Sequence, residues 1–137
     1  MYVVIVGSGR VGATLANRLS SEGHAAAVVD IESDSFRRYL DDDFRGRAIL
    51  GDGIDQGILR RAGIERADAF VAAAHGDNHN QMAAQIACLV FKVPRVVARR
   101  NDPIRMEAFE GLGLATVCPS LIAAEALNGA LMDEPLH

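Results

Sequence analysis

The sequence predicts an α/β domain of the doubly wound, Rossmann type, with about six parallel strands and helices on both faces of the sheet. Three observations predict this fold. Short apolar runs alternate with segments of helical period, a glycine-rich turn follows the first run, and an aspartate ends the second. Parallel strands need crossover connections, and helices provide them. At 137 residues, 50% of them hydrophobic, the chain has the size of one domain.

Six strand–helix pairs follow one another along the chain. The expected strands are apolar runs of the length of buried strands, at 2–6, 25–29, 47–50, 69–74, 95–98 and 115–118. The segments of helical period are 10–21, 33–40, 56–61, 77–92, 103–111 and 120–132. Gly23 and Gly111 stand where a left-handed C-terminal cap favours glycine, and Pro94 ends the fourth helix. We expect residues 1–119 to form a nucleotide-binding domain and residues 120–137 a terminal helix and tail.

The turn after the first strand reads GSGRVG, residues 7–12. In such a turn Gly7 permits the tight exit from the strand, Gly9 lets the backbone approach a pyrophosphate, and Gly12 allows close packing of helix and strand. The amides at the start of the next helix then face the phosphate oxygens, helped by the helix dipole. The turn therefore predicts a site for the phosphates of a nucleotide.

Asp30 ends the second strand, where a carboxylate can accept hydrogen bonds from both hydroxyls of an adenosine ribose. The same charge repels a 2′-phosphate, and the next residue is Ile31 rather than an arginine. NAD, or another adenosine with an unphosphorylated ribose, is therefore favoured over NADP. The alternative is that Asp30 merely caps the helix that follows.

Three more side chains belong to the same edge of the sheet. Arg10 either folds over the phosphates or is a solvated residue of the first helical turn, where a cation opposes the dipole. Asp52 either receives an adenine amino group or is a turn aspartate before Gly53. Asn80 is expected to face the ligand from the first turn of the fourth helix, with Asp77 as that helix's cap. The other expected cofactor-binding residues are Ser8, Val11, Ile31, Gly51, Ala73 and Ala74.

Composition excludes several classes of function. A net charge of -4 and a pI near 5.5 argue against a nucleic-acid binder. The longest apolar stretches are six residues, against roughly 20 for a spanning helix, and no leader precedes the first strand, so we expect a cytoplasmic domain that does not insert into a membrane. His75 and His79 lack a third ligand nearby, so no metal is expected, and Cys88 and Cys118 are expected to be buried thiols.

The sequence offers no reaction centre. It contains no GxSxG, HExxH or P-loop motif, and its four histidines form no relay with a carboxylate. A dehydrogenase also needs room for a second substrate and a group that donates or accepts a proton. The residues therefore predict a nucleotide-binding domain that is not an enzyme.

The last helical segment is apolar nearly all round. From Leu121 to Met132 nine of twelve residues are apolar, interrupted only by Glu125, Asn128 and Gly129. Such a helix needs more partners than one sheet face provides. We expect it to pack against another copy or against the rest of a longer protein, and the alternative is a fully buried terminal helix.

An ordered set of motifs across residues 2–132 resembles a known family. The motifs are VVIVGSGRVGATLANRL, VVD, ILGDGID, ADAFVAAAHGDNHNQMAAQIA, RVVARRNDP and GLGLATVCPS. Together they resemble the N-terminal nucleotide-binding domain of the TrkA/RCK (KTN) family. The resemblance implies a cytoplasmic regulatory subunit at the inner face of the membrane. It would assemble as dimers or rings on a membrane potassium transporter or channel and respond to bound NAD(H), ATP or ADP.

The resemblance also implies roles for single residues. It places Gly7, Gly9, Arg10 and Gly12 at the phosphates, Asp30 at the ribose, Asp52 on the adenine side, and Arg99 near the phosphates or the dimer contact. The terminal helix resembles the element that packs against a second subunit. The smaller C-terminal domain of the family lies outside these residues, as expected of a truncated chain or a short relative. Ser120 stands where some relatives carry an acid linked to cation binding, so no metal is expected there.

Two other functions remain open from the sequence. The chain is either such a nucleotide-sensing regulator, or the cofactor-binding part of an NAD-dependent oxidoreductase, or a plain oligomerisation module with a vestigial site. Ligand titration and turnover distinguish the three.

Overall fold

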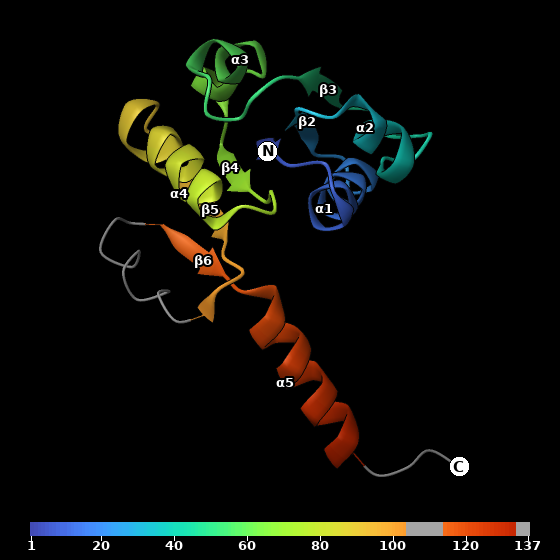
Figure 1. Ribbon diagram of the computed structural model, residues 1–137. Helices are drawn as coiled ribbons and strands as arrows, with labels where there is room; N and C mark the ends of the chain where they lie inside the picture. The colour runs from blue at the N-terminus through green and yellow to red at the C-terminus, as the bar shows by residue number, and fades with distance from the viewer. Residues whose placement is uncertain (104–113, 134–137) are drawn as a thin grey trace.

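The computed structural model, which describes residues 1–103 and 114–133, has a single parallel sheet at its centre (Figure 1). The six strands of this described part lie in the order β3-β2-β1-β4-β5-β6, and every neighbouring pair is parallel. Their bounds are β1 (Tyr2–Val6), β2 (Ala25–Asp30), β3 (Arg47–Leu50), β4 (Ala69–Ala72), β5 (Arg95–Arg99) and β6 (Ala115–Val117). The predicted fold class is confirmed.

Helices follow the first four strands and the last one. They are α1 (Arg10–Ser21), α2 (Ser33–Tyr39), α3 (Gln56–Arg61), α4 (Asp77–Gln85) and α5 (Pro119–Met132). A short 3-10 helix, η1 (Ile64–Arg66), follows α3, and a π-helical segment, η2 (Ile86–Val90), continues α4. The helix expected over residues 103–111, with Gly111 as its cap, lies outside the described residues.

Alternation along the central strand creates the two faces of the sheet. Val3 and Ile5 face one side, where the apolar residues of α1 and α2 cover them. Val4 and Val6 face the other side, in one cluster with residues of α3, η1 and α4. Because both faces are covered, the central strands are apolar throughout, as parallel strands generally are. The carboxyl ends of the strands remain as the edge that a ligand can reach.

The fourth helix departs from its predicted form. It was expected to run as one helix to residue 92, but it is α-helical only to Gln85 and then forms η2. Within η2 the N–H of Phe91 donates to the carbonyl of Ile86, which is the five-residue spacing of a π-turn. The spacing of the apolar residues predicts one buried stripe along this helix, made of Met82, Ala83, Ile86, Ala87, Leu89 and Val90. The wider turn rotates the last of these residues, so the stripe is only partly buried. Ala83 and Ala87 are buried, whereas Met82, Leu89 and Val90 are exposed.

The structure also tests the predicted helix cap at Gly23 and the predicted burial of the two cysteines. Gly23 follows α1 with a φ of 87°, the left-handed conformation that its position predicts. Cys118 is buried, but Cys88 is only half-buried, because it lies in η2 near the end of the helix.

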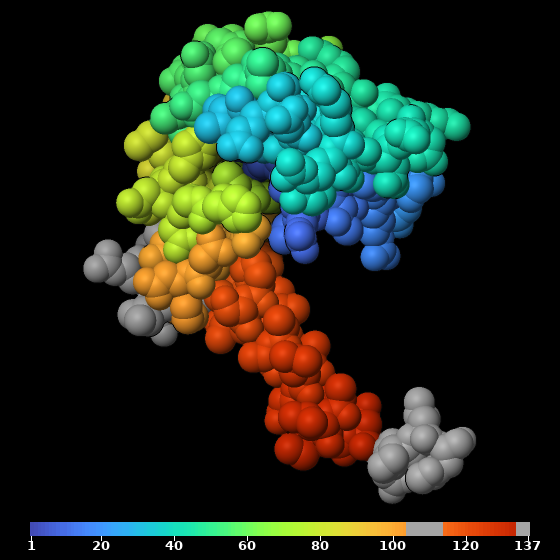
Figure 2. Space-filling view, turned by 45° about the vertical axis from the view of Figure 1, so that its right-hand side comes forward, coloured from blue at the N-terminus to red at the C-terminus, as the bar shows by residue number. Residues whose placement is uncertain are grey.

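α5 extends away from the sheet (Figures 1 and 2). It begins at Pro119, whose fixed φ suits the first turn of a helix. None of its residues is buried, so the alternative of a fully buried terminal helix is wrong within the described chain. Across residues 1–103 and 114–133 no helix is long and apolar enough to cross a membrane.

Candidate functional site

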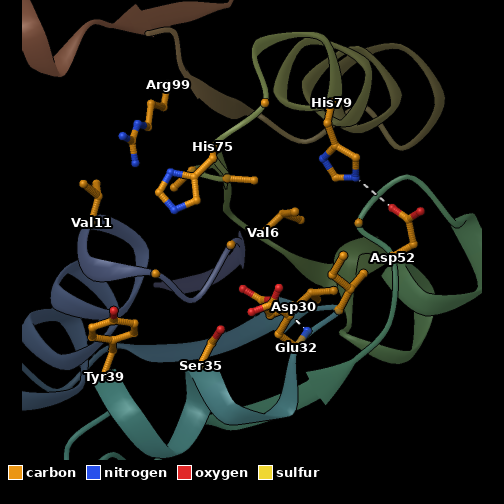
Figure 3. A pocket seen from close by; sticks show the side chains of 18 of the residues that line it. Val6, Val11, Asp30, Glu32, Ser35, Tyr39, Asp52, His75, His79 and Arg99 are labelled. Atoms are coloured by element: carbon orange, nitrogen blue, oxygen red, sulfur yellow. Dashed lines mark hydrogen bonds and ion pairs between the residues drawn. The ribbon is translucent and has the colours of Figure 1, made fainter.

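A cavity of about 690 Å³ opens at the carboxyl edge of the sheet (Figure 3). Its size is within the range of small-molecule and cofactor sites, roughly 300–1,000 Å³. It lies where the strand order reverses: the chain runs from β1 toward β2 and β3 on one side and returns to β4 on the other. Open α/β sheets bind their ligands at this switch point.

Most of the sequence-predicted residues meet in this cavity. Those that line it are Gly7, Gly9, Arg10, Val11, Asp30, Ile31, Gly51, Asp52, Ala73, Ala74 and Arg99. Ser8, Gly12 and Asn80 are not among the lining residues. Ser8 and Asn80 instead hold the wall of the cavity through hydrogen bonds, and Gly12 packs closely against Gly7.

The three glycines of the turn serve different needs. Gly7 has a φ of 105°, and a Cβ there would lie 2.7 Å from the amide nitrogen of Ala74. A Cβ on Gly12 would overlap the carbonyl oxygen of Gly7. At Gly9 the nearest atom to an added Cβ would be Nε2 of His75, at 3.7 Å. Packing of the chain therefore requires Gly7 and Gly12, whereas Gly9 leaves a length of backbone open to the cavity.

Helix N-termini supply positive potential beside this open backbone. α1 begins after Gly9 and α4 after Gly76, and neither helix has a side chain that caps its N-terminus. Both glycines line the cavity. α3 differs, because its N-cap Asp55 accepts hydrogen bonds from the N–H groups of Gly57 and Ile58. The uncapped amides of α1 fit the oxygens of a phosphate group.

Asp30 connects the glycine turn to the second strand. Its Oδ2 accepts a hydrogen bond from the N–H of Ser8 at 2.7 Å, and its Oδ1 accepts one from the N–H of Glu32 at 2.9 Å. The N-cap of α2 is Glu32, so Asp30 is not the cap of that helix. Each carboxylate oxygen has a second acceptor site. Asp30 can therefore receive hydroxyl groups of a ligand while it holds the turn.

Basic side chains gather around the turn. Arg10 and Arg38 both line the cavity and flank Tyr39, whose pKa they lower through hydrogen bonds, with Arg10 contributing most. The guanidinium of Arg38 also lies over the Tyr39 ring, 6.0 Å from its centroid. Arg10 is thus held across the opening between α1 and α2. Arg99 approaches the cavity from the end of β5 (Figure 3).

Asp52 and His79 form an ion pair or strong hydrogen bond at the other side of the cavity. The Nε2 of His79 lies 2.7 Å from Oδ1 of Asp52, and the N–H of Ile54 donates to the same oxygen at 3.1 Å. The hydrogen bond from His79 is the main reason that the pKa of Asp52 is below its ordinary value. Asp52 is therefore both a turn aspartate and a wall of the cavity.

Asn80 and Asp77 have other partners than the sequence predicts. Asn80 is completely buried, and it accepts a hydrogen bond from the N–H of Ala74 at 2.9 Å while its amide donates to the carbonyls of Ala74 and Arg99. It supports the wall of the cavity from behind and is not among the residues that line it. Asp77 does not cap α4, because its carboxylate accepts from the N–H groups of Asn101 and Asp102. Contacts with the end of β5 and the residues that follow it therefore replace the helix cap predicted for Asp77 and the ligand contact predicted for Asn80.

Sequence reasoning missed one whole wall of the cavity. The residues that it missed include Val6, Val29, Glu32, Ser35, Arg38, Tyr39, Gly53, His75, Gly76 and His79. Glu32, Ser35, Arg38 and Tyr39 come from α2 or its N-cap and are spaced by three or four residues. That spacing places them on one face of a helix, so helical period could have predicted them. Among the described residues, no group of three His, Cys, Asp or Glu side chains could hold a metal ion.

The strand order, the ligand-sized cavity at the switch point and the glycine turn define a nucleotide-binding domain of the Rossmann class. Residues 3–119 match the TrkA-N domain, and the chain belongs to that family. The Trk system potassium uptake protein TrkA of Streptomyces coelicolor is 50% identical over an alignment 139 residues long, and this alignment covers 99% of this chain. The match covers 62% of that relative's own length.

Two solved structures have the same fold at low sequence identity. The TrkA-N domain of the inner membrane protein ybaL from Escherichia coli has a TM-score of 0.81 at 19% identity, and the match covers 96% of each chain. The GsuK bound to ADP has a TM-score of 0.82 at 23% identity, over 96% of this chain and 34% of that one. The recognition of the family from its motifs is confirmed.

Proposed function

We propose that this chain is a nucleotide-sensing regulatory domain of a potassium uptake system. It binds NAD(H) or ATP/ADP at the switch-point cavity, at the inner face of the membrane, and biases a membrane potassium transporter or channel. The relative from Streptomyces coelicolor is a potassium uptake protein, and the GsuK structure was solved with ADP. Both support this proposal. The nucleotide acts as an effector and is not consumed.

The open backbone at Gly9 is the observation that carries the proposal. The chain itself gives no packing reason for a glycine there, since a Cβ would have ordinary contact distances. The uncapped N-terminus of α1 begins at this residue, and Arg10 lies beside it. A group with several oxygens and negative charge fits this arrangement, and Asp30 is placed to receive its sugar.

A chain of contacts leads from the cavity to α5. The side chain of Asn101 donates to the carbonyl of His75 at 2.7 Å and accepts from Nε of Arg99 at 3.0 Å. The backbone carbonyl of Asn101 accepts a hydrogen bond from the thiol of Cys118 at 3.8 Å, and Cys118 is the N-cap of α5. A nucleotide that moves the β4 loop or Arg99 therefore acts on residues in contact with the start of α5. An effector regulates in this way when it binds two arrangements with different affinity.

α5 supports assembly with a second copy of the chain. Its exposed apolar residues include Leu121, Ile122, Leu127, Leu131 and Met132. Exposed apolar surface of this extent is typical of a protein interface. In the proposed assembly the pair of α5 helices links two cavities, and the oligomer presents them to the membrane subunit.

Calorimetric titration with NADH, NAD, ATP and ADP tests the proposal. We expect at least one of them to bind with a dissociation constant below the millimolar range, and NADPH to bind more weakly than NADH. Arg10→Ala removes a charged donor near the phosphates and should weaken binding about tenfold. Arg18→Ala is the matched control, because Arg18 lies on the same helix but pairs with Glu22 at the surface. It should leave the affinity unchanged.

Two results would replace this proposal with another function. Absence of binding by all four nucleotides would leave a plain oligomerisation module. Oxidation of NADH by a small carbonyl substrate, followed as loss of its absorbance, would make the chain the cofactor-binding part of an oxidoreductase.

A further inference from the structure

We propose that His79 positions the carboxylate of Asp52 so that the base end of the cavity selects purines that carry a 6-amino group. This inference rests on the proposed nucleotide binding and adds a specificity-determining residue to it. His79 belongs to α4, and Asp52 follows β3, so the pair joins the loop after β3 to a helix on the opposite side of the switch point.

The contacts of Asp52 leave one oxygen for a ligand. His79 and the N–H of Ile54 both donate to Oδ1. Among the described residues, Oδ2 of Asp52 accepts no hydrogen bond. The side chain of Asp52 is 49% exposed, so without His79 only the N–H of Ile54 would restrain it. The bond from His79 holds one oxygen against α4 and leaves the other available to the cavity.

The position of this pair assigns it to the base. Arg99 and Val11 lie on one side of the cavity, the Asp52–His79 pair lies on the opposite side, and Asp30 lies between them (Figure 3). With the phosphates at the N-terminus of α1 and the ribose at Asp30, the nucleotide extends its base toward Asp52. Val6, Val29 and Ile31 line the cavity as well and offer apolar contact to the faces of a base ring.

The surroundings of His79 restrict how its ring is oriented. Its Nδ1 is buried, and no described residue forms a hydrogen bond with it. A proton on that nitrogen would be a buried donor without an acceptor, which is unfavourable. The ring proton therefore belongs on Nε2, the atom that faces Asp52. His79 then acts as a fixed donor and Asp52 as a fixed acceptor.

A fixed acceptor at this place distinguishes one purine from another. The 6-amino group of adenine donates a hydrogen bond to Oδ2, whereas a purine with hydrogen at position 6 leaves that oxygen without a donor. Loss of one hydrogen bond to a charged group typically lowers affinity about tenfold or more. The selectivity depends on His79 because a mobile carboxylate loses part of the gain when it is ordered by the ligand.

The test compares AMP with purine riboside 5′-monophosphate, which differs from AMP only in lacking the amino group. Dissociation constants of both are measured by calorimetry for the full chain and for three variants. We expect the unaltered chain to prefer AMP about tenfold, and His79→Leu to reduce that ratio to about two. His79→Gln, whose amide can replace the Nε2 donor, should restore most of the preference.

His24→Leu is the matched control. His24 contacts the N-terminal amino group rather than the cavity, so the same substitution there should leave the ratio unchanged. If His79→Leu does not fold, Asp52→Asn provides the second variant. The histidine would still bind its oxygen, the amide nitrogen would face the ligand, and the preference for AMP should disappear.

Three outcomes would overturn the inference. If His79→Leu weakens both nucleotides equally, His79 only holds the loops together. If the unaltered chain binds both nucleotides with equal affinity, the amino group is not recognised, although the proposed function stands. If the unaltered chain binds neither monophosphate, the inference fails, and the separate titrations with NADH, NAD, ATP and ADP decide whether the proposed function fails with it.

Discussion

The three glycines of the GSGRVG turn separate folding from ligand binding at single residues. Gly12→Ala places a methyl group onto the carbonyl oxygen of Gly7, within the backbone, where neither group can move aside. We expect it to lower the free energy of unfolding by roughly 3–5 kcal/mol. Gly9→Ala meets only the far end of His75, so it should cost about 1 kcal/mol or less. It should still weaken nucleotide binding roughly tenfold or more, because the methyl group occupies ligand space.

Denaturant unfolding and calorimetric titration of both variants check this prediction. A Gly9→Ala variant that binds nucleotide as tightly as the unaltered chain would show that the ligand does not approach this backbone. A Gly12→Ala variant of unchanged stability would mean that α1 can move away from β1 without loss.

Single residues were predictable from sequence where the backbone determines their role. Glycine at Gly7 and Gly12 and the carboxylate of Asp30 follow from the geometry of a strand–turn–helix unit, and all three have close contacts there. Asn80 and His79 were not predictable in the same way. Their partners come from β5 and from the β3 loop, and only the folded sheet brings those segments beside α4.

At the scale of elements, Asp77 ties the start of α4 to the end of β5. Burial raises the pKa of Asp77, but hydrogen bonds from Asn101 and Asp102 and the charge of Arg100 outweigh this and hold the pKa below 3.8. A carboxyl whose pKa is lower in the folded state stabilises the fold above its ordinary pKa. That stabilisation is lost as the pH falls through the folded-state value. Asp77→Asn should therefore cost roughly 1–2 kcal/mol near neutral pH and make the acid limb of the stability profile shallower.

Chemical unfolding across the range from neutral to acid pH measures this effect. Asp42→Asn is the matched control, since Asp42 is exposed and makes no hydrogen bond among the described residues. Equal loss in the two variants, or a profile for Asp77→Asn that stays parallel to that of the unaltered chain, would contradict the role of Asp77.

Elements were predictable to the extent that local pattern decides them. The strands and the starts of the helices follow from apolar runs and turns, because those signals lie within a few neighbouring residues. The π-turn at Ile86–Val90 was not visible in the pattern. The apolar spacing of Met82, Leu89 and Val90 suggests one continuous stripe, but the wider turn moves Leu89 and Val90 off the buried face, and Met82 is exposed before that turn begins.

At the scale of the whole molecule, the sheet and the terminal helix differ in what stabilises them. Two apolar clusters cover the faces of the sheet, so its strand order follows from burial and from right-handed crossovers. α5 has no buried residue, so burial against the sheet does not stabilise it, and the proposed assembly would supply that burial from a second copy. The apolar composition of α5 predicts a partner, and that expectation stays a prediction. The sequence could not predict where the helix would project, since no periodic polar face orients it against the sheet.

The partner of α5 is open to a direct test through Leu127, which is 67% exposed on that helix. In an assembly of two α5 helices, Leu127→Glu would bury a charge without a counter-ion, which should raise the dissociation constant of the oligomer roughly thirtyfold or more. The thermal stability of the separated chain should not change, because Leu127 packs against no buried residue of its own domain.

Sedimentation equilibrium at several concentrations measures the proportions of monomer and oligomer. Leu89→Glu is the matched control, as Leu89 is 63% exposed but lies on η2, and it should leave the oligomer intact. Equal dissociation by the two variants, or an unaltered chain that stays monomeric throughout, would show that α5 does not join two copies.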